Sequence, residues 1–65
     1  MVSYDKLWKL LIDKKMTKTA LCEKADMSSS TMAKMGKNET ISMDVLIRIC
    51  KVLNCNVGDI MDVIK

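Results

Sequence analysis

The stretch Thr17–Asn38, TKTALCEKADMSSSTMAKMGKN, decides the fold of this chain. It indicates two short helices joined by a tight turn, because a polar cap residue precedes each of two segments with helical apolar spacing. The second segment separates its side chains by face, with small polar and cationic residues on one side and methionines on the other. The outward positions are Ser29, Ser30 and Lys34, and the inward positions are Met32 and Met35.

A helix held rigidly on a second helix, with a small polar and cationic outer face, suits insertion into the major groove of DNA. We therefore expect the segment near 28–36 to contact double-stranded DNA. The alternative is that Ser29, Ser30 and Lys34 are ordinary exposed residues of a helix, because such residues usually lie at the surface whatever the function.

One pattern of helix start recurs five times along the chain. A polar residue that caps free backbone N–H groups follows an apolar residue, which is placed to pack on another apolar residue in the first turn. Proline is absent, and no segment of alternating β-branched residues competes. The sequence therefore predicts an all-α fold, a compact five-helix single domain over residues 1–65. The helices are expected near 3–14, 17–24, 28–36, 42–53 and 56–63, with caps Ser3, Thr17, Ser28, Ser42 and Asn56.

Apolar residues at helical spacing predict the core, and two of the expected helices carry such a stripe. We take Trp8 as a core residue rather than a ligand platform, and five methionines as fillers of irregular gaps between short helices. The stripes are Tyr4, Leu7, Trp8 and Leu11 in the first helix and Val45, Leu46, Ile49, Cys50 and Leu53 in the fourth. The methionines are Met16, Met27, Met32, Met35 and Met43.

Charge is unevenly distributed along the 65 residues, which carry a net charge of +3. Residues 1–37 hold eight lysines and four carboxylates, whereas residues 38–65 hold three basic and four acidic side chains. This asymmetry favours nucleic-acid binding by the first half. No apolar run reaches the ~18 residues of a membrane span, and the N-terminal residues lack the apolar segment of a signal peptide. We therefore expect a cytoplasmic protein without membrane contact.

The chain has three cysteines, Cys22, Cys50 and Cys55, and no histidine. In a reducing compartment they are best interpreted as small buried hydrophobic residues. A zinc site needs a fourth ligand and a paired spacing, and both are missing, so we expect no metal site. The cysteines also lack a base partner, and the chain has no glycine-rich phosphate loop, so we expect neither a cofactor nor an enzyme activity.

Several separated motifs resemble one known group of proteins. They include an apolar and a small residue before the turn, a serine-rich opening of the next helix, and the apolar spacing of the last two helices. The residues are Leu21-Cys22, Met27, Ser28–Met32, Val45-Leu46, Ile49-Cys50, Leu53, Val57 and Ile60. In this order and spacing they resemble the lambda-repressor-like, Cro/CI-type helix-turn-helix proteins, also called the XRE family, over about residues 3–61. The resemblance implies that helices 2 and 3 form the helix-turn-helix.

The chain departs from the family pattern at several places, among them Cys22 and Cys50 at two small alanine positions. Asp26 stands where the turn usually holds a glycine at positive φ, a conformation that aspartate tolerates at some cost. Many members have Glu-x-Gly after the recognition helix, with the glutamate paired to an arginine of helix 1. Here the positions hold Gly36-Lys37-Asn38 and Leu11, so both charged partners are missing together. Helix 3 is expected to end at Gly36 or to continue to a left-handed Asn38.

By resemblance, helix 3 enters the major groove and helix 2 lies across the DNA backbone. The residues expected to contact bases are Ser29, Ser30 and Lys34. The residues expected to contact phosphates are Thr17, Lys18, Ser28, Lys37 and Asn38, although a simple turn role fits Lys37 and Asn38 equally well.

Apolar residues near the C-terminus predict either a cap on the core or a dimer contact, and we favour the dimer. The residues are Ile60, Met61, Val63 and Ile64. The sequence thus predicts a homodimeric transcriptional regulator, a repressor because there is no room for an effector or activation domain. The alternative is an antitoxin-like or scaffold module that binds protein, but such a module would display apolar anchors on helix 3 rather than serines and lysine.

Overall fold

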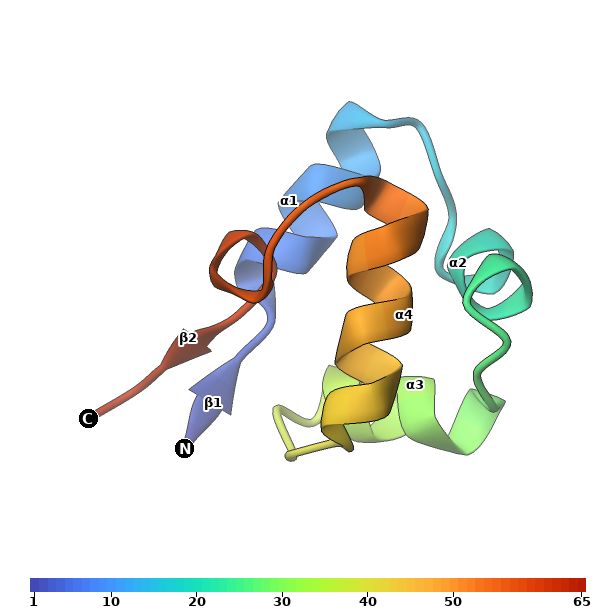
Figure 1. The fold of residues 1–65 in the computed structure, drawn as a ribbon. Coiled ribbons are helices and arrows are strands. Elements are labelled where there is room, and N and C mark those ends of the chain that lie inside the picture. The colour runs from blue at the N-terminus through green and yellow to red at the C-terminus, as the bar shows by residue number, and fades with distance from the viewer.

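The computed structural model describes residues 1–65 as four α-helices and a short two-stranded ribbon (Figure 1). The elements in chain order are β1 Val2–Ser3, α1 Asp5–Asp13, α2 Lys18–Lys24, α3 Ser29–Gly36, α4 Met43–Leu53, a 3-10 turn η1 Val57–Asp59, and β2 Asp62–Val63. None of these helices has the length and apolar character needed to cross a membrane.

Three of the predicted helix starts are confirmed in detail. Thr17, Ser28 and Ser42 each accept a hydrogen bond through the side-chain oxygen from the backbone N–H three residues later, at 3.0, 3.2 and 3.3 Å. Each cap satisfies a donor that the helix leaves free and stabilises its helix by about 1 kcal/mol. These bonds span only three residues, so the local sequence is sufficient to specify them.

The predicted first helix start is wrong, whereas Asn56 does cap the fifth segment, with its backbone N–H donating to the Asp59 carboxylate at 2.9 Å. Ser3 lies in β1, and α1 begins at Asp5 with Tyr4 as the residue before it. The segment predicted as a helix over 56–63 forms only the single 3-10 turn of η1 and then extends into β2. The fold is therefore mostly helical with four α-helices, and the five-helix, all-α prediction is corrected.

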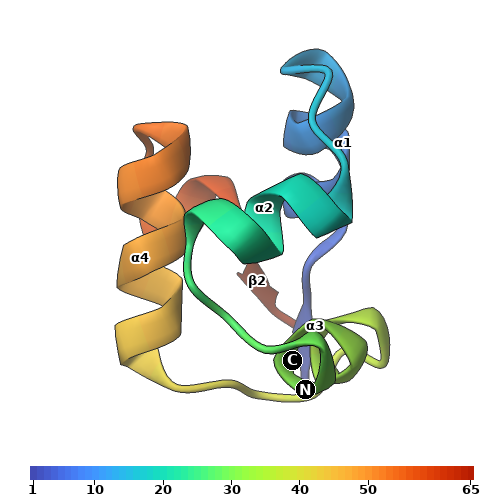
Figure 2. The same ribbon diagram turned by 90° about the vertical axis from the view of Figure 1, so that its right-hand side faces the viewer.

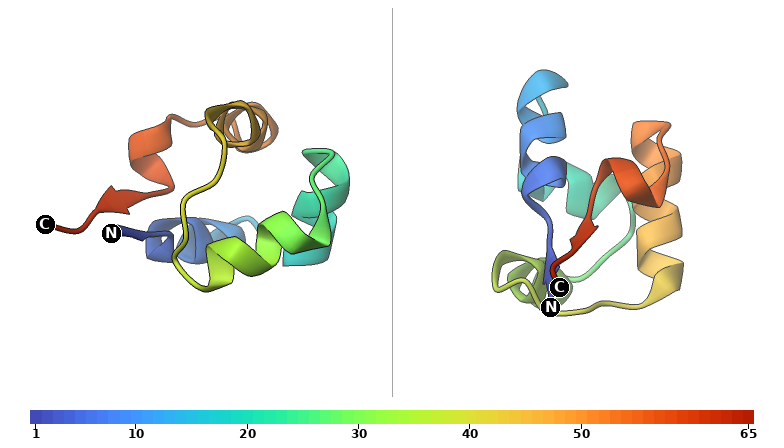
Figure 3. Two further views of the ribbon diagram at one scale, coloured as in Figure 1. Left: turned by 90° about the horizontal axis from the view of Figure 1, so that it is seen from below. Right: turned by 90° about the vertical axis from the view of Figure 1, so that its left-hand side faces the viewer.

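The physical reason is that the two ends of the chain meet in space (Figures 1 and 3). β1 and β2 pair antiparallel, with Val2 opposite Val63 and Ser3 opposite Asp62. The backbone N–H of Ile64 donates to the carbonyl oxygen of Met1 at 2.8 Å. Residues 62–64 thus obtain their backbone hydrogen bonds from β1 rather than from a helical turn.

Three helices end in the same way, at a residue with left-handed backbone that is not glycine: Lys15 (φ 54°), Asp26 (φ 52°) and Asn38 (φ 58°). After α3, the N–H of Asn38 donates to the carbonyl of Met35 at 3.0 Å, and the N–H of Glu39 donates to that of Lys34 at 2.9 Å. This pair of bonds is the Schellman arrangement, which satisfies carbonyl groups that the helix leaves free. It shows which of the two expected end points of helix 3 is correct. The helix stops at Gly36, and Asn38 is left-handed.

The core consists of thirteen buried hydrophobic residues drawn from every part of the chain. It includes most of both predicted stripes, and full burial contributes roughly 1.5–3 kcal/mol for each large apolar side chain. Two predictions need correction: Trp8 is only half-buried, and Met43 is 58% exposed at the first position of α4. The buried stripe residues are Tyr4, Leu7 and Leu11 and, in α4, Val45, Leu46, Ile49 and Leu53.

The helix α3 lies along one end of the molecule, across the first turn of α4 (Figure 1). Seen from the right-hand side of Figure 1, α2 is stacked above α3, with the chain between them looping toward α4 (Figure 2). This arrangement leaves the side of α3 that faces away from α2 and α4 free for a ligand.

Candidate nucleic-acid interface

The turn between α2 and α3 sets the angle between the two helices. Ala25 and Met27 point into the core from this turn, and Asp26 between them takes the left-handed conformation. The backbone N–H of Met27 donates to the carbonyl of Cys22 at 3.0 Å, which closes the end of α2. Two buried side chains flanking one strained residue hold α3 in a single orientation on α2.

Arg48 of α4 contacts this turn and stabilises it. Its guanidinium Nη1 donates to the backbone carbonyl of Asp26 at 2.9 Å and lies 3.9 Å from the carboxylate of the same residue. Its Nε lies 3.5 Å from the Asp44 carboxylate, one helical turn earlier. The sequence analysis missed Arg48, although an acid four residues before a base in a helix is a recognisable pairing pattern.

The outward face of α3 is as predicted. Ser29, Ser30 and Lys34 are exposed, whereas Met35 is fully buried and Met32 is partly buried against the core. The sequence analysis missed one further exposed position, Ala33. It lies four residues after Ser29 and so falls on the same face of the helix.

The hydroxyl groups at the start of α3 are not equivalent. The Oγ of Ser28 lies 3.0 Å from the hydroxyl oxygens of both Ser30 and Thr31, and it also accepts the N–H of Thr31. Ser28 is therefore committed to capping, and Ser30 is already hydrogen-bonded. The Ser29 hydroxyl makes no hydrogen bond within the chain, so its donor and acceptor positions are all free.

At the start of α2, Thr17 caps the helix and the Lys18 ammonium lies over the ring of Trp8, 4.2 Å from its centroid. A cation over an indole ring at an exposed site gains about 0.5–1 kcal/mol. The contact fixes the charged side chain of Lys18, a residue of the first turn of α2, where backbone N–H groups are also free. Both features attract an anion such as a phosphate group.

Asn38 has a structural role that the sequence analysis left open. Its side-chain Oδ1 accepts from the backbone N–H of Tyr4 at 3.4 Å, and the Tyr4 hydroxyl donates to the carbonyl of Glu39 at 2.8 Å. Burial raises the pKa of the Tyr4 hydroxyl, which keeps it protonated as a donor. The end of α3 is thereby tied to the start of α1. Lys37, the neighbouring C-cap residue, is exposed.

The C-terminal residues do not form the predicted apolar stripe. Ile60 is completely buried in the core of its own chain, so its expected role in a dimer contact is not compatible with its position. Met61 is partly buried against the core, whereas Val63 and Ile64 are 64% and 47% exposed. The Lys6 ammonium holds this segment against α1 through an ion pair of 3.0 Å with Asp62.

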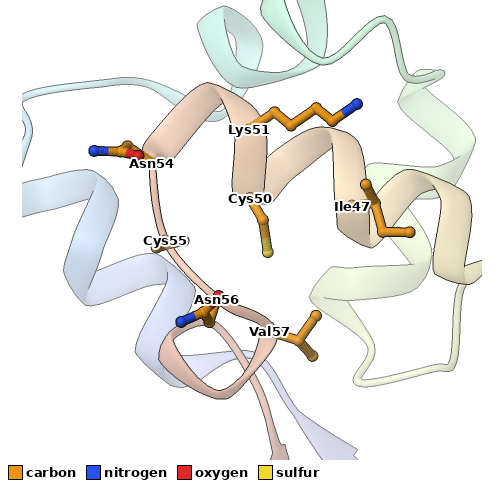
Figure 4. Close-up of a pocket in the computed structure, with 7 residues that line it drawn as sticks. All are labelled: Ile47, Cys50, Lys51, Asn54, Cys55, Asn56 and Val57. Carbon is orange, nitrogen blue, oxygen red and sulfur yellow. The ribbon is translucent and has the colours of Figure 1, made fainter.

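Two hollows lie outside the α2–α3 region. One, of about 370 Å³, is bounded by α4 and η1 (Figure 4), and the other, of about 380 Å³, lies between α1 and the end of α4. Neither is lined by a residue of α2 or α3. No group of three or more histidine, cysteine or acidic side chains is placed to hold a metal ion.

A family model described as "Cro/C1-type HTH DNA-binding domain" matches residues 6–65. This match covers nearly the whole chain, including α2, the turn and α3. The chain belongs to the Cro/C1-type helix-turn-helix family. Its α2 and α3 are the two helices of the motif, which confirms the resemblance that the sequence suggested.

A solved structure of similar fold is the crystal structure of the transcriptional regulator VanUg, form II. It is 57% identical in sequence with a TM-score of 0.91, and the match covers 94% of this chain and 81% of that chain. A comparison with curated protein sequences gave no match. Both positive findings concern Cro/C1-type or regulatory proteins, so a DNA-binding regulator is the class of protein to which this chain is similar.

Proposed function

We propose that this chain is a small cytoplasmic transcriptional repressor that binds specific double-stranded DNA as a homodimer, with α3 in the major groove. The observation that carries the proposal is the division of α3 into two faces. Met35 fixes one face in the core, while Ser29, Ser30 and Lys34 are exposed on the other. A rigidly held helix with short polar side chains approaches base edges closely, as direct readout requires.

Within the groove, Lys34 donates to the O6 and N7 acceptors of guanine, and Ser29 and Ser30 donate to or accept from bases of either kind. Ser29 has its whole hydroxyl available for this, whereas Ser30 shares part of its hydrogen-bonding capacity with Ser28. Ala33 adds a methyl group on the same face, suited to the methyl group of thymine. The proposal includes no catalytic step, no cofactor and no small-molecule effector.

Phosphate contacts come from the ends of the helices. Thr17, Lys18 and the free N–H groups of α2 hold one phosphate, and Ser28 with Lys37 lies along the other side of the groove. Asn38 contributes through its side-chain NH₂, because its Oδ1 is already occupied by Tyr4. These contacts set the register of α3 but carry little sequence information.

Dimerisation follows from the small number of contacts that one chain offers. A two-fold pair reads two half-sites about 10 base pairs apart, or a multiple of that spacing. The exposed apolar residues at the joined termini, Met1, Val63 and Ile64, with Met61 beside them, are the proposed contact. Sedimentation of the protein with and without DNA tests this part, and a monomer well above micromolar concentration in both would contradict it.

The central test is enrichment of sheared genomic DNA by the purified protein at ~150 mM salt, where non-specific binding is weak. We expect recovery of a few sites that share an inverted repeat. Lys34→Ala should weaken this enrichment and relax the preference at one base position, whereas Lys51→Ala should keep it unchanged, because Lys51 is an exposed lysine near the far end of α4.

A folded protein that enriches no sequence would overturn the proposal. The remaining candidate would be a protein-interaction module, the alternative function that the sequence also allows. Its docking face would then be sought on α4, where Met43 and Ile47 are 58% and 44% exposed.

A further inference from the structure

Cys50 and Cys55 are brought together by the end of α4. Cys50 lies in the last turn of the helix and Cys55 follows the left-handed residue Asn54 (φ 54°). The backbone N–H of Cys55 donates to the carbonyl of Cys50 at 3.0 Å. This closed turn fixes the two cysteines beside each other, five positions apart in the sequence, whereas the third cysteine, Cys22, lies separately on α2.

Both residues line the same open hollow of about 370 Å³ between α4 and η1. Figure 4 shows the sulfur of Cys50 directed from α4 toward the side of the loop and Val57. Burial raises the pKa of the Cys55 thiol, and the neighbouring Cys50 side chain raises it further. Both thiols are half-buried rather than sealed.

The remaining groups around the thiols limit what the hollow would bind. Ile47 and Val57 supply apolar walls, and the Lys51 ammonium is directed away from the Cys50 sulfur (Figure 4). The nearby Asp59 carboxylate already accepts the backbone N–H of Asn56 at 2.9 Å. Two sulfur atoms are thus the only soft ligands present, with no third metal-ligating side chain grouped with them.

We propose that Cys50 and Cys55 form a two-coordinate site for a soft, thiophilic monovalent metal ion of the Cu(I) class. Thiolates select soft ions of this kind, which are satisfied by two sulfur ligands, whereas zinc takes four ligands in structural sites. The missing third and fourth ligands exclude a structural zinc site but not an ion that needs two.

Binding at this site needs no oxidant or reductant. Two S–H bonds break, two metal–sulfur bonds form, and two protons pass to solvent, so the metal keeps its oxidation state. The resulting complex carries one negative charge, and the Lys14 ammonium, which already lowers the pKa of Cys55, offsets part of it. Because both thiols must lose a proton, affinity should rise with pH through the neutral range.

The test uses Ag(I), a soft monovalent ion that does not change oxidation state, with pre-reduced protein in chloride-free buffer. Excess free methionine prevents the seven methionine side chains from competing. We expect one Ag(I) per chain and a rise in Tm. Cys50→Ser and Cys55→Ser should each lower affinity by more than about tenfold, because a ligand itself is removed. Cys22→Ser is the matched control and should bind as the wild type does, and Zn(II) should give no rise in Tm.

Equal losses from all three serine variants, or binding that persists in the Cys50→Ser, Cys55→Ser double variant, would overturn the proposal. Ag(I) that bridges two chains rather than binding within one would also overturn it, and size-exclusion chromatography distinguishes these cases. The experiment contains no DNA, so its outcome is independent of the proposed regulatory function.

Discussion

Arg48 and Asp26, twenty-two positions apart, are joined by a hydrogen bond from the guanidinium Nη1 to the backbone carbonyl at 2.9 Å. The bond connects the middle of α4 to the one left-handed residue between the two helices of the DNA-binding motif. It acts on the backbone rather than on the Asp26 carboxylate, whose side chain is fully exposed. The conformation of the turn therefore depends on a side chain that lies outside the motif.

Removing the Arg48 guanidinium should loosen the turn. Arg48→Met keeps the aliphatic stem, and we expect the free energy of unfolding to fall by about 1.5–3 kcal/mol because a charge-assisted hydrogen bond is lost. Urea unfolding measures this change. Asp44→Asn is the control, since it removes only the exposed 3.5 Å ion pair and should cost below about 0.5 kcal/mol. Equal losses from both variants would show that the ion pair, not the Asp26 carbonyl, is the stabilising contact.

The left-handed positions of this chain are occupied by residues other than glycine, whereas both glycines have ordinary φ. Asp26→Gly should raise the free energy of unfolding by about 0.5–1 kcal/mol, because glycine adopts positive φ without steric cost. Gly36→Ala, the reverse exchange, should also stabilise the fold by about 0.5–1 kcal/mol, because its Cβ would meet no atom within 4 Å. Thermal and urea unfolding measure both. A loss of stability in Asp26→Gly would mean that its carboxylate contributes more than its exposure implies.

Lys34 and Lys18 should affect DNA binding differently. Lys34→Ala should cost about 1–3 kcal/mol on the preferred site and relax preference at one base position. Lys18→Ala should weaken binding to all sequences alike and reduce the salt dependence by about one unit. Titrations of specific and scrambled duplexes at several salt concentrations measure both effects, with Lys51→Ala as the control. Identical sequence-independent losses from the two variants would show that Lys34 contacts phosphate rather than a base.

Tyr4 should make the free energy of unfolding fall at alkaline pH. Its pKa is raised by burial above the ordinary value of 10.0, so the folded state favours the protonated hydroxyl. Stability from this group is complete below pH 10 and is lost as pH rises through the higher folded pKa. Tyr4→Phe should remove this component of the pH dependence and cost about 1–3 kcal/mol at neutral pH, since the Glu39 carbonyl loses its donor. Unfolding followed from pH 8 to pH 12 tests both, and an unchanged alkaline transition in Tyr4→Phe would assign it to other groups.

The sequence by itself determined the features that depend on neighbouring residues. The caps Thr17, Ser28 and Ser42 act over three residues, and the two faces of α3 follow from the helical period. The site residues of α3 could therefore be predicted before their surroundings were known. Ala33 lies on the same face by the same period.

Only the tertiary structure decided the features whose partners are distant in sequence. Val2 pairs with Val63, which turned the predicted fifth helix into a strand, and no local pattern signals that the two termini meet. The Tyr4–Asn38 and Arg48–Asp26 contacts span 34 and 22 positions. In each case a backbone group needed a hydrogen-bonding partner, and packing of the core selected which distant residue would supply it.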